Sequence, residues 1–176
     1  MRVIVASDIH GYVYYAKKLV ERFKAEKAEQ LILLGDIYYH GSGTSEEYDE
    51  EEVKNLLNDM WDKIVCTRGN CDNEVDEMVS RFSFIDSLEF NIGEKKVYLA
   101  HGNRINWEFP HYYGDIIIFG HLHKGFIKKE QDIIIANTGS VSLPRGGTEN
   151  SYIVLTDNTI ELKNLDGKLL DCQELN

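Results

Sequence analysis

Residues 3–11 read Val-Ile-Val-Ala-Ser-Asp-Ile-His-Gly, so four apolar residues run directly into an aspartate and a histidine. A short apolar run that is rich in β-branched residues and bounded by polar residues is typical of a buried strand. The glycine that follows permits a sharp backbone turn and the close approach of a ligand. We therefore predict a buried strand over residues 3–6 that ends in a loop carrying Asp8 and His10.

The same arrangement occurs four more times along the chain. The further predicted strands are Leu31–Leu34, Ile64–Thr67, Val97–Ala100 and Ile116–Phe119. The polar segments that follow them are, in the same order, Gly35-Asp36, Arg68-Gly69-Asn70-Cys71-Asp72, His101-Gly102-Asn103 and Gly120-His121-Leu122-His123. Each segment alone is typical of an ordinary turn. Because ligands gather beyond the carboxyl ends of strands in α/β sheets, five such segments in register predict one shared site.

The rest of the chain adds helices and further strands. Apolar stripes at helical spacing predict one helix between Tyr12 and about Ala28, and a second through Val53, Leu56, Leu57 and Met60. Thr44 and Glu47 have capping-box spacing before the second helix, and a weaker helix is predicted after Asn73. Late strands are predicted over Ile133–Ala136, Tyr152–Thr156 and Thr159–Leu165.

This order of elements favours an α/β fold. The early part resembles βαβ units, and the late part resembles a second, mostly antiparallel group of strands. We expect two packed β-sheets, a β-sandwich, with helices on the outside, and we expect residues 1–176 to form a single domain.

Composition limits the partners and the location. The formal net charge is −11 at pH 7, and so acidic a surface repels nucleic-acid backbones and anionic membranes. General nucleic-acid binding and membrane association are therefore not expected. No apolar run approaches the roughly 20 residues that span a bilayer, and no signal peptide is recognisable. Cys66, Cys71 and Cys172 lack the spacing of a disulfide framework, so a cytoplasmic location is expected.

The residue types in the five segments favour one kind of chemistry. Imidazole and carboxylate ligands suit divalent ions such as Mn²⁺, Fe²⁺, Zn²⁺, Co²⁺ and Ni²⁺. A structural zinc site would instead use thiolates or a closed tetrahedral set, and the chain has no Cys-x-x-Cys. There are too many candidate ligands for one ion, and Asp36 could bridge two. Paired ions activate water and clamp both oxygens of a displacement at phosphorus, so we predict a two-metal phosphoesterase.

The chain resembles the calcineurin-like metallophosphoesterase superfamily through its ordered motifs Asp8-Ile9-His10, Gly35-Asp36, Gly69-Asn70-Cys71-Asp72, His101-Gly102 and Gly120-His121-Leu122-His123. Its small size, the Gly-Asn-Cys-Asp variant and the loop around residues 137–145 resemble the compact YfcE-type phosphodiesterase branch. The resemblance implies a double β-sandwich flanked by helices, and in-line attack on small phosphodiesters by a hydroxide that bridges two metals. It assigns one ion to Asp8, His10, Asp36 and His123, and the other to Asp36, Asn70, His101 and His121. Mn²⁺ is the favoured ion.

The resemblance also implies catalytic roles for Asn70, Cys71, Asp72 and His101. Many superfamily members have a histidine where this chain has Cys71, and a thiol with an ordinary pKa near 8.5 is a weaker partner for a leaving group. We therefore expect a preference for diesters with good leaving groups, unless Cys71 is only a small residue in a turn. Asp72 is expected to accept a hydrogen bond from a ligating imidazole, or else to form a turn or a helix cap.

Other residues allow more than one interpretation. His40 either reaches the site from its loop or is an exposed loop residue. Arg145 either contacts a substrate phosphate or orders its loop. The aromatic stretch 107–113, which includes His111, forms surface packing, a dimer contact or a rim on which substrate stacks, so a homo-oligomer stays open.

Two other functions remain as alternatives. The superfamily includes the retromer subunit of vacuolar sorting, a scaffold of similar fold that binds partners, but no expected ligand is missing from this chain. A phosphomonoesterase would use the same metals, and Cys71 argues against it. Neither the natural substrate nor the native metal follows from these residues.

Overall fold

The computed structural model describes residues 1–39 and 47–175, and within them the chain forms two β-sheets. The first sheet has the strand order β12-β11-β10-β1-β2-β3-β4, and the second has the order β5-β6-β7-β9-β8. The strands of the first sheet are β1 (Arg2–Ala6), β2 (Gln30–Leu33), β3 (Ile64–Thr67), β4 (Phe84–Ile85), β10 (Ser151–Thr156), β11 (Thr159–Asn164) and β12 (Leu169–Glu174). Those of the second are β5 (Leu88–Ile92), β6 (Lys95–Ala100), β7 (Ile116–Phe119), β8 (Phe126–Glu130) and β9 (Ile133–Asn137). The helices are α1 (Val13–Ala25), α2 (Glu50–Asn58) and α3 (Glu74–Val79), with 3₁₀ turns at Trp61–Lys63 and Pro110–Tyr112.

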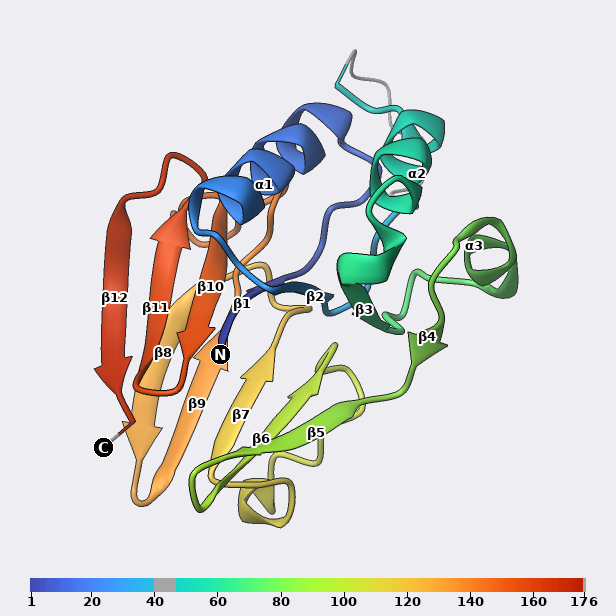
Figure 1. Ribbon diagram of the computed structural model, residues 1–176. Coiled ribbons are helices and arrows are strands. Elements are labelled where there is room, and N and C mark those ends of the chain that lie inside the picture. The colour runs from blue at the N-terminus through green and yellow to red at the C-terminus, as the bar shows by residue number, and fades with distance from the viewer. Residues whose placement is uncertain (40–46, 176) are drawn as a thin grey trace.

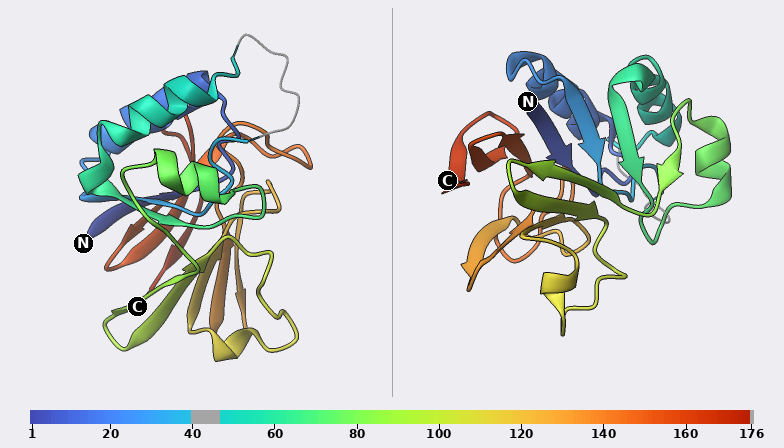
Figure 2. Two further views of the ribbon diagram at one scale, coloured as in Figure 1. Left: turned by 90° about the vertical axis from the view of Figure 1, so that its right-hand side faces the viewer. Right: turned by 60° about the horizontal axis from the view of Figure 1, so that its bottom comes forward.

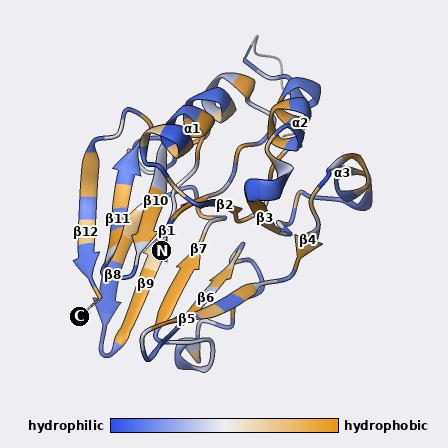
Figure 3. Ribbon diagram, in the orientation of Figure 1, coloured by the Kyte–Doolittle hydropathy of each residue, from blue (hydrophilic) through white to orange (hydrophobic). Residues whose placement is uncertain are grey.

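The sheets pack face to face, and α1 and α2 cover the outer face of the first sheet (Figure 1, Figure 2). Alternate residues of β1 explain this layering, because Val3 and Val5 lie in the core between the sheets whereas Ile4 and Ala6 pack toward the helices. A strand that is covered on both faces is apolar along its length, as the central strands are in Figure 3. The predicted fold class is confirmed.

Parallel pairing gathers the ends of the strands that precede the polar segments. In the first sheet β1 pairs in parallel with β2, and β2 with β3. In the second sheet β6 pairs in parallel with β7, and β7 with β9. The carboxyl ends of each parallel set therefore lie along one edge of their sheet, and their loops project from that edge.

The late strands are arranged differently from the prediction. Strand β10 pairs antiparallel with β1, and β11 and β12 follow it, so these strands extend the first sheet rather than forming a separate group. The second sheet is built from residues 88–137 and mixes parallel and antiparallel pairs. The pairing of Ile4 with Val154 joins residues that are far apart in the chain, and no local pattern contains that information.

The helices begin and end for local reasons. Helix α1 buries the predicted stripe through Ala16, Leu19 and Val20. Helix α2 begins at Glu50, where the Asp49 side chain accepts a hydrogen bond from the Glu52 amide at 2.9 Å. The predicted capping box was therefore wrong, because its Glu47 precedes the cap and its Thr44 lies outside the described residues.

The predicted helix after Asn73 is α3, and Asn73 caps it with a capping box to Asp76. Its apolar residues Val75, Met78 and Val79 are exposed rather than packed in the core. Within the described residues, no helix combines the length and apolar character needed to cross a membrane.

Candidate metal centre

Seven side chains that follow five different strands converge at the edge where the two sheets meet. Asp8 and His10 follow β1, Asp36 follows β2, Asn70 follows β3, His101 follows β6, and His121 and His123 follow β7. These are the seven residues that the sequence predicted as metal ligands. Their convergence is a property of the fold, whereas their role as ligands stays a prediction.

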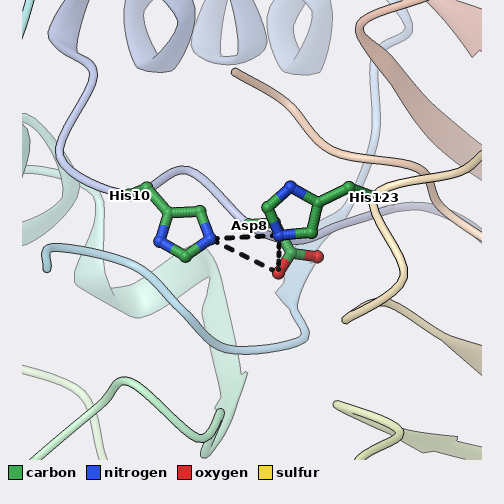
Figure 4. Close-up of side chains that lie close together, drawn as sticks. All are labelled: Asp8, His10 and His123. Carbon is green, nitrogen blue, oxygen red and sulfur yellow. Dashed lines mark hydrogen bonds and ion pairs between the residues drawn. The ribbon is translucent and has the colours of Figure 1, made fainter. Parts of the chain in front are cut away.

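One group is formed by Asp8, His10 and His123 (Figure 4). The Nε2 atoms of His10 and His123 are 3.2 Å apart. Asp8 Oδ1 lies 3.7 Å from the first and 3.2 Å from the second. These three atoms face a common point, which is the arrangement that a bound cation requires.

A second group, around Asp36 and His101, adjoins the first. Asp36 Oδ2 lies 3.8 Å from His10 Nε2 and 3.4 Å from His101 Nε2. His101 Nε2 also lies 2.9 Å from Asn70 Oδ1 and 3.2 Å from His121 Nδ1. Asp36 is thus placed between two clusters of nitrogen and oxygen atoms.

The buried carboxylate of Asp8 shows that the site suits a cation. Its Oδ2 accepts hydrogen bonds from Ser7 Oγ and, at 2.9 Å, from the His121 amide. Its Oδ1 has no hydrogen-bond partner among the described residues although the side chain is fully buried. A buried acceptor without a hydrogen bond is costly, and a divalent cation between Oδ1 and the two nearby imidazole nitrogens would satisfy it.

The imidazoles are held so that a ring nitrogen faces the cluster. His10 Nδ1, His101 Nδ1 and His123 Nδ1 donate to the carbonyl oxygens of Tyr39, Leu34 and Leu143, at 2.8, 2.6 and 2.8 Å. A histidine that donates one ring N–H to a fixed acceptor presents the lone pair of its other nitrogen. Three rings therefore offer Nε2 to the centre of the cluster.

The ionisable groups of the site influence one another. Burial opposes ionisation of Asp8, but its contacts with His10 and His123 outweigh burial and hold the pKa of Asp8 below its ordinary value. Burial likewise opposes protonation of His101, and the neighbouring Asp36 outweighs it and raises the pKa of His101. The carboxylates and imidazoles of the site thus stabilise one another's charged forms.

The backbone of the site is strained. Asp8, His10, Asp36, His121 and His123 have φ angles of 58°, 51°, 55°, 65° and 57°. Residues other than glycine rarely adopt this left-handed conformation, and such outliers cluster at functional sites. The close approach of the loops also requires Gly69, because a side chain there would collide with the Asp36 carboxylate.

Of the two roles expected for Asp72, the structure fits the turn rather than the imidazole partner. Its carboxylate accepts hydrogen bonds from the backbone amides of Asp36, Ile37 and Gly69 at 2.8, 2.9 and 2.7 Å. The expectation that it accepts from a ligating imidazole is therefore wrong for the described residues. The turn after Gly69 points the carboxylate at the neighbouring loop, so Asp72 positions Asp36 through the backbone.

Cys71 lies at the mouth of the site. Its amide donates to Asp36 Oδ1 at 2.8 Å, and the Asn70 side chain donates to its sulfur at 3.4 Å. Burial, together with the charge of Asp36, raises the pKa of the thiol to about 12.

Arg145 lines the same cavity, which encloses about 340 Å³ and also includes Tyr39 and Cys71 in its lining. The Arg145 amide donates to the His123 carbonyl at 2.7 Å. Among the described residues, its guanidinium forms no ion pair. His40 lies outside the described residues, and His111 lies on the exposed 3₁₀ turn of the second sheet, in contact with the Tyr112 ring.

The sequence analysis did not predict the polar residues that hydrogen-bond to the loop carrying Asp8. Ser140 Oγ donates to the Asp8 carbonyl at 2.7 Å, and Ser142 Oγ donates to the Ile9 carbonyl at 2.8 Å. Thr138 Oγ1 lies 2.8 Å from Ser7 Oγ. One feature of the sequence could have indicated them. Ile133–Ala136 is a sixth apolar segment, and polar residues follow it directly.

Comparison with known proteins agrees with this geometry. Residues 1–159 match the family model of the calcineurin-like phosphoesterase superfamily domain. The chain is 32% identical to "Phosphodiesterase YfcE" of Escherichia coli (strain K12) over 98% of this chain and 97% of that protein. It is 26% identical to "Probable metallophosphoesterase YsnB" of Bacillus subtilis (strain 168) over 89% of this chain and 84% of that protein.

Solved structures show the same relationship. The E. coli phosphoesterase Yfce matches with a TM-score of 0.92 at 30% identity and covers 100% of both chains. Vps29 from Entamoeba histolytica matches with a TM-score of 0.67 at 19% identity, over 100% of both chains, a likeness that concerns the fold alone. From the family model and the similarity to YfcE, we conclude that this chain belongs to the calcineurin-like phosphoesterase superfamily.

Proposed function

We propose that the protein is a metal-dependent phosphodiesterase that hydrolyses small phosphodiesters. The observation that carries this proposal is the convergence of seven nitrogen- and oxygen-bearing side chains, with Asp36 between His10 and His101. The similarity to a phosphodiesterase over nearly the whole chain supports it.

The donor set suits two divalent ions. Asp8, His10, Asp36 and His123 would hold one, and Asp36, Asn70, His101 and His121 would hold the other. Mn²⁺ is our first choice, and Ni²⁺, Zn²⁺, Fe²⁺ and Co²⁺ suit the same mixture of imidazole and carboxylate. When bound, such ions lower the pKa of water and neutralise charge at the phosphate.

The reaction that we propose consumes one water. A new phosphorus–oxygen bond forms from the water oxygen, the bond to the leaving oxygen breaks, and the water protons end on the leaving alcohol and on solvent. The products are a phosphate monoester and an alcohol. In-line attack places the water and the leaving oxygen on opposite sides of phosphorus.

Three residues near the candidate ligands, Arg145, Asn70 and Cys71, affect how the phosphate and the leaving group are bound. Arg145 carries a guanidinium without an ion-pair partner among the described residues, and such a group binds two phosphate oxygens at once. Asn70 contacts both His101 and Cys71, so it lies between a candidate ligand and the thiol. A thiol carries no positive charge in either protonation state, so Cys71 supplies none to a leaving oxygen. We therefore expect fast hydrolysis only for good leaving groups.

The test is hydrolysis of bis-p-nitrophenyl phosphate with added Mn²⁺. We expect turnover that is proportional to enzyme and abolished by EDTA, and much slower hydrolysis of the monoester p-nitrophenyl phosphate. A protein that binds the ions but turns over neither compound would favour the scaffold alternative. Faster hydrolysis of the monoester would favour a phosphomonoesterase.

We also propose that the protein works in the cytoplasm. Cys66, Cys71 and Cys172 are all free thiols, which suits a reducing compartment.

A further inference from the structure

A groove with an apolar lining lies on the outer face of the second sheet. It encloses about 360 Å³, which is within the range of small-molecule sites. Its lining includes Trp107, Phe119, Leu122, Phe126, Lys128 and Ile135. The helices α1 and α2 cover the other sheet, whereas this face is covered by the segment between β6 and β7, drawn in olive in Figure 1.

The groove adjoins the candidate metal centre through the loop after β7. Leu122 belongs to the groove lining, and the residues on either side of it, His121 and His123, belong to the lining of the metal cavity. Consecutive Cα atoms are about 3.8 Å apart, so one end of the groove is a single residue away from two candidate ligands. The Phe119 ring packs directly on Gly102, the residue that follows His101.

Aromatic rings form the walls of the groove. The Trp107 ring lies 4.7 Å from the Phe119 ring, and the Phe119 ring lies 6.1 Å from that of Phe126. Trp107 and Leu122 are 42% and 46% exposed, so much of their apolar surface is open to a ligand. Lys128 pairs with Glu130 at 2.6 Å, so its charge is compensated at the far end of the groove.

We propose that this groove binds the ester group that stays on phosphorus during hydrolysis, and that it selects an aromatic or other flat apolar group. This inference rests on the proposed phosphodiesterase function. In a displacement at phosphorus, the attacking and departing oxygens are in line and the other substituents point sideways. The groove extends from Leu122, beside the candidate ligands, along β8 to Lys128 and Glu130, so a retained substituent that leaves the candidate ligands past Leu122 would enter it.

The dimensions of the groove favour a small group over a second protein. The volume of about 360 Å³ lies within the range of small-ligand sites. Flat rings also gain from offset or edge-on contacts with aromatic walls. The substrates that fit are therefore phosphodiesters in which one ester group is aromatic.

The kinetic test uses two diesters that share the p-nitrophenol leaving group. One carries a phenyl group as its second ester, and the other carries a methyl group. In the Mn²⁺-loaded protein, Trp107→Ala and Phe126→Ala should each lower kcat/KM for the phenyl diester by about tenfold, mainly through KM, and change the methyl diester by less than about twofold. Comparing variants with the unchanged protein cancels the difference in intrinsic reactivity between the two diesters.

The matched control is Tyr112→Ala. Tyr112 is an aromatic residue of the same segment, is 74% exposed and lies outside the groove lining. It should leave the preference between the two diesters unchanged. Variants that retain the full preference for the phenyl diester, or that lose both activities equally, would overturn the proposal while leaving the phosphodiesterase function intact.

A binding measurement supplies a readout that does not depend on turnover. The chain has two tryptophans, so Trp61→Phe leaves Trp107 as the reporter. In the Zn²⁺-loaded protein, phenylphosphonate should shift the emission of Trp107 saturably, and methylphosphonate should not. No shift with phenylphosphonate would overturn the proposal.

Two further outcomes separate this inference from its alternatives. If sedimentation shows a dimer that Trp107→Ala dissociates, with no change in the preference between the diesters, the groove is an interface between copies and the proposal is wrong. If the unchanged protein hydrolyses neither diester, the proposed function itself fails, and this proposal fails with it.

Discussion

At the scale of single residues, Asp36 contacts residues from both sheets through its carboxylate and its backbone amide. One of its oxygens lies within 4 Å of histidines from both sheets, and the other accepts the Cys71 amide. Its own amide is held by Asp72. Both oxygens of the Asp36 carboxylate therefore contact other residues of the site.

Replacing Asp36 tests whether one carboxylate serves both ions. Asp36→Ala should reduce bound metal from about two ions per chain toward none, and reduce diesterase activity by more than about a hundredfold, since even outer contacts of metal sites are worth 10–100-fold. Elemental analysis of the purified protein measures the metal. Asp132→Ala, which removes an exposed aspartate from the turn after β8, is the charge-matched control. Normal metal content in Asp36→Ala would refute a bridging role.

Cys71 determines which leaving groups the site accepts. Cys71→His replaces the thiol with an imidazole, which can carry a positive charge. A general acid of this kind raises a reaction rate by about 10²–10⁴-fold. We expect hydrolysis of p-nitrophenyl phosphate to rise by at least about tenfold relative to bis-p-nitrophenyl phosphate. Cys71→Ser, which keeps a small neutral group, should show no rise. If Cys71→His binds its metals normally but hydrolyses p-nitrophenyl phosphate no faster, then Cys71 is only a small residue in a turn.

At the scale of elements, the sequence predicted those site residues that directly follow a recognisable strand in the chain. A buried strand and the polar loop after it are neighbours in sequence, which is why Asp8, Asp36 and His101 could be selected together. Asp72 was misjudged because its partners are backbone amides, which no side-chain pattern marks. Ser140 and Ser142 were missed for a similar reason, since their acceptors are the carbonyls of Asp8 and Ile9, more than 130 residues away.

The end of α1 is joined to the first sheet by a charged cluster. Glu26 caps α1 and pairs with Arg2 of β1 and Lys163 of β11, while the Tyr152 hydroxyl of β10 donates to it at 3.2 Å. Burial opposes ionisation of Glu26, but the hydrogen bonds from Lys163 and Arg2 outweigh burial and hold its pKa below the ordinary value. The cluster thus links one helix to three strands.

This cluster predicts a pH dependence of stability. Because the folded-state pKa of Glu26 lies below its unfolded value, its contribution is complete above about pH 5 and is lost as the pH falls through the folded-state pKa. At pH 7, Glu26→Gln should lower the free energy of unfolding by about 1–3 kcal/mol, the range for hydrogen bonds to charged groups. The difference from the unchanged protein should shrink toward pH 3.

Urea denaturation at several pH values measures this effect. Glu21→Gln makes the same charge change on the exposed side of the same helix and should have little effect at any pH. A Glu26→Gln difference that stays constant from pH 7 to pH 3 would show that packing, rather than charge, is what the substitution removes.

At the scale of the whole molecule, the site lies where the two sheets meet. Asp8, Asp36 and Asn70 follow strands of the first sheet, and His101, His121 and His123 follow strands of the second. The assignment of β10–β12 to the first sheet could not be predicted, because it depends on pairs such as Ile4 and Val154. The location of the site did not require that assignment, because it depends only on the parallel strands.

Cations held by residues from both sheets should therefore stabilise the whole fold. Without them, the molecule must keep buried carboxylates and left-handed backbone at Asp8 and Asp36 with no ion to compensate. A ligand at about 100 times its dissociation constant adds roughly 2.7 kcal/mol, which for a chain of this length raises the unfolding temperature by about 5–10 °C. Scanning calorimetry with Mn²⁺ and with EDTA measures the difference, and Asp36→Ala should abolish it. If the protein binds two ions and its unfolding temperature does not change, then the ions do not join the sheets, and the ligands that we assign from one of the two sheets are wrong.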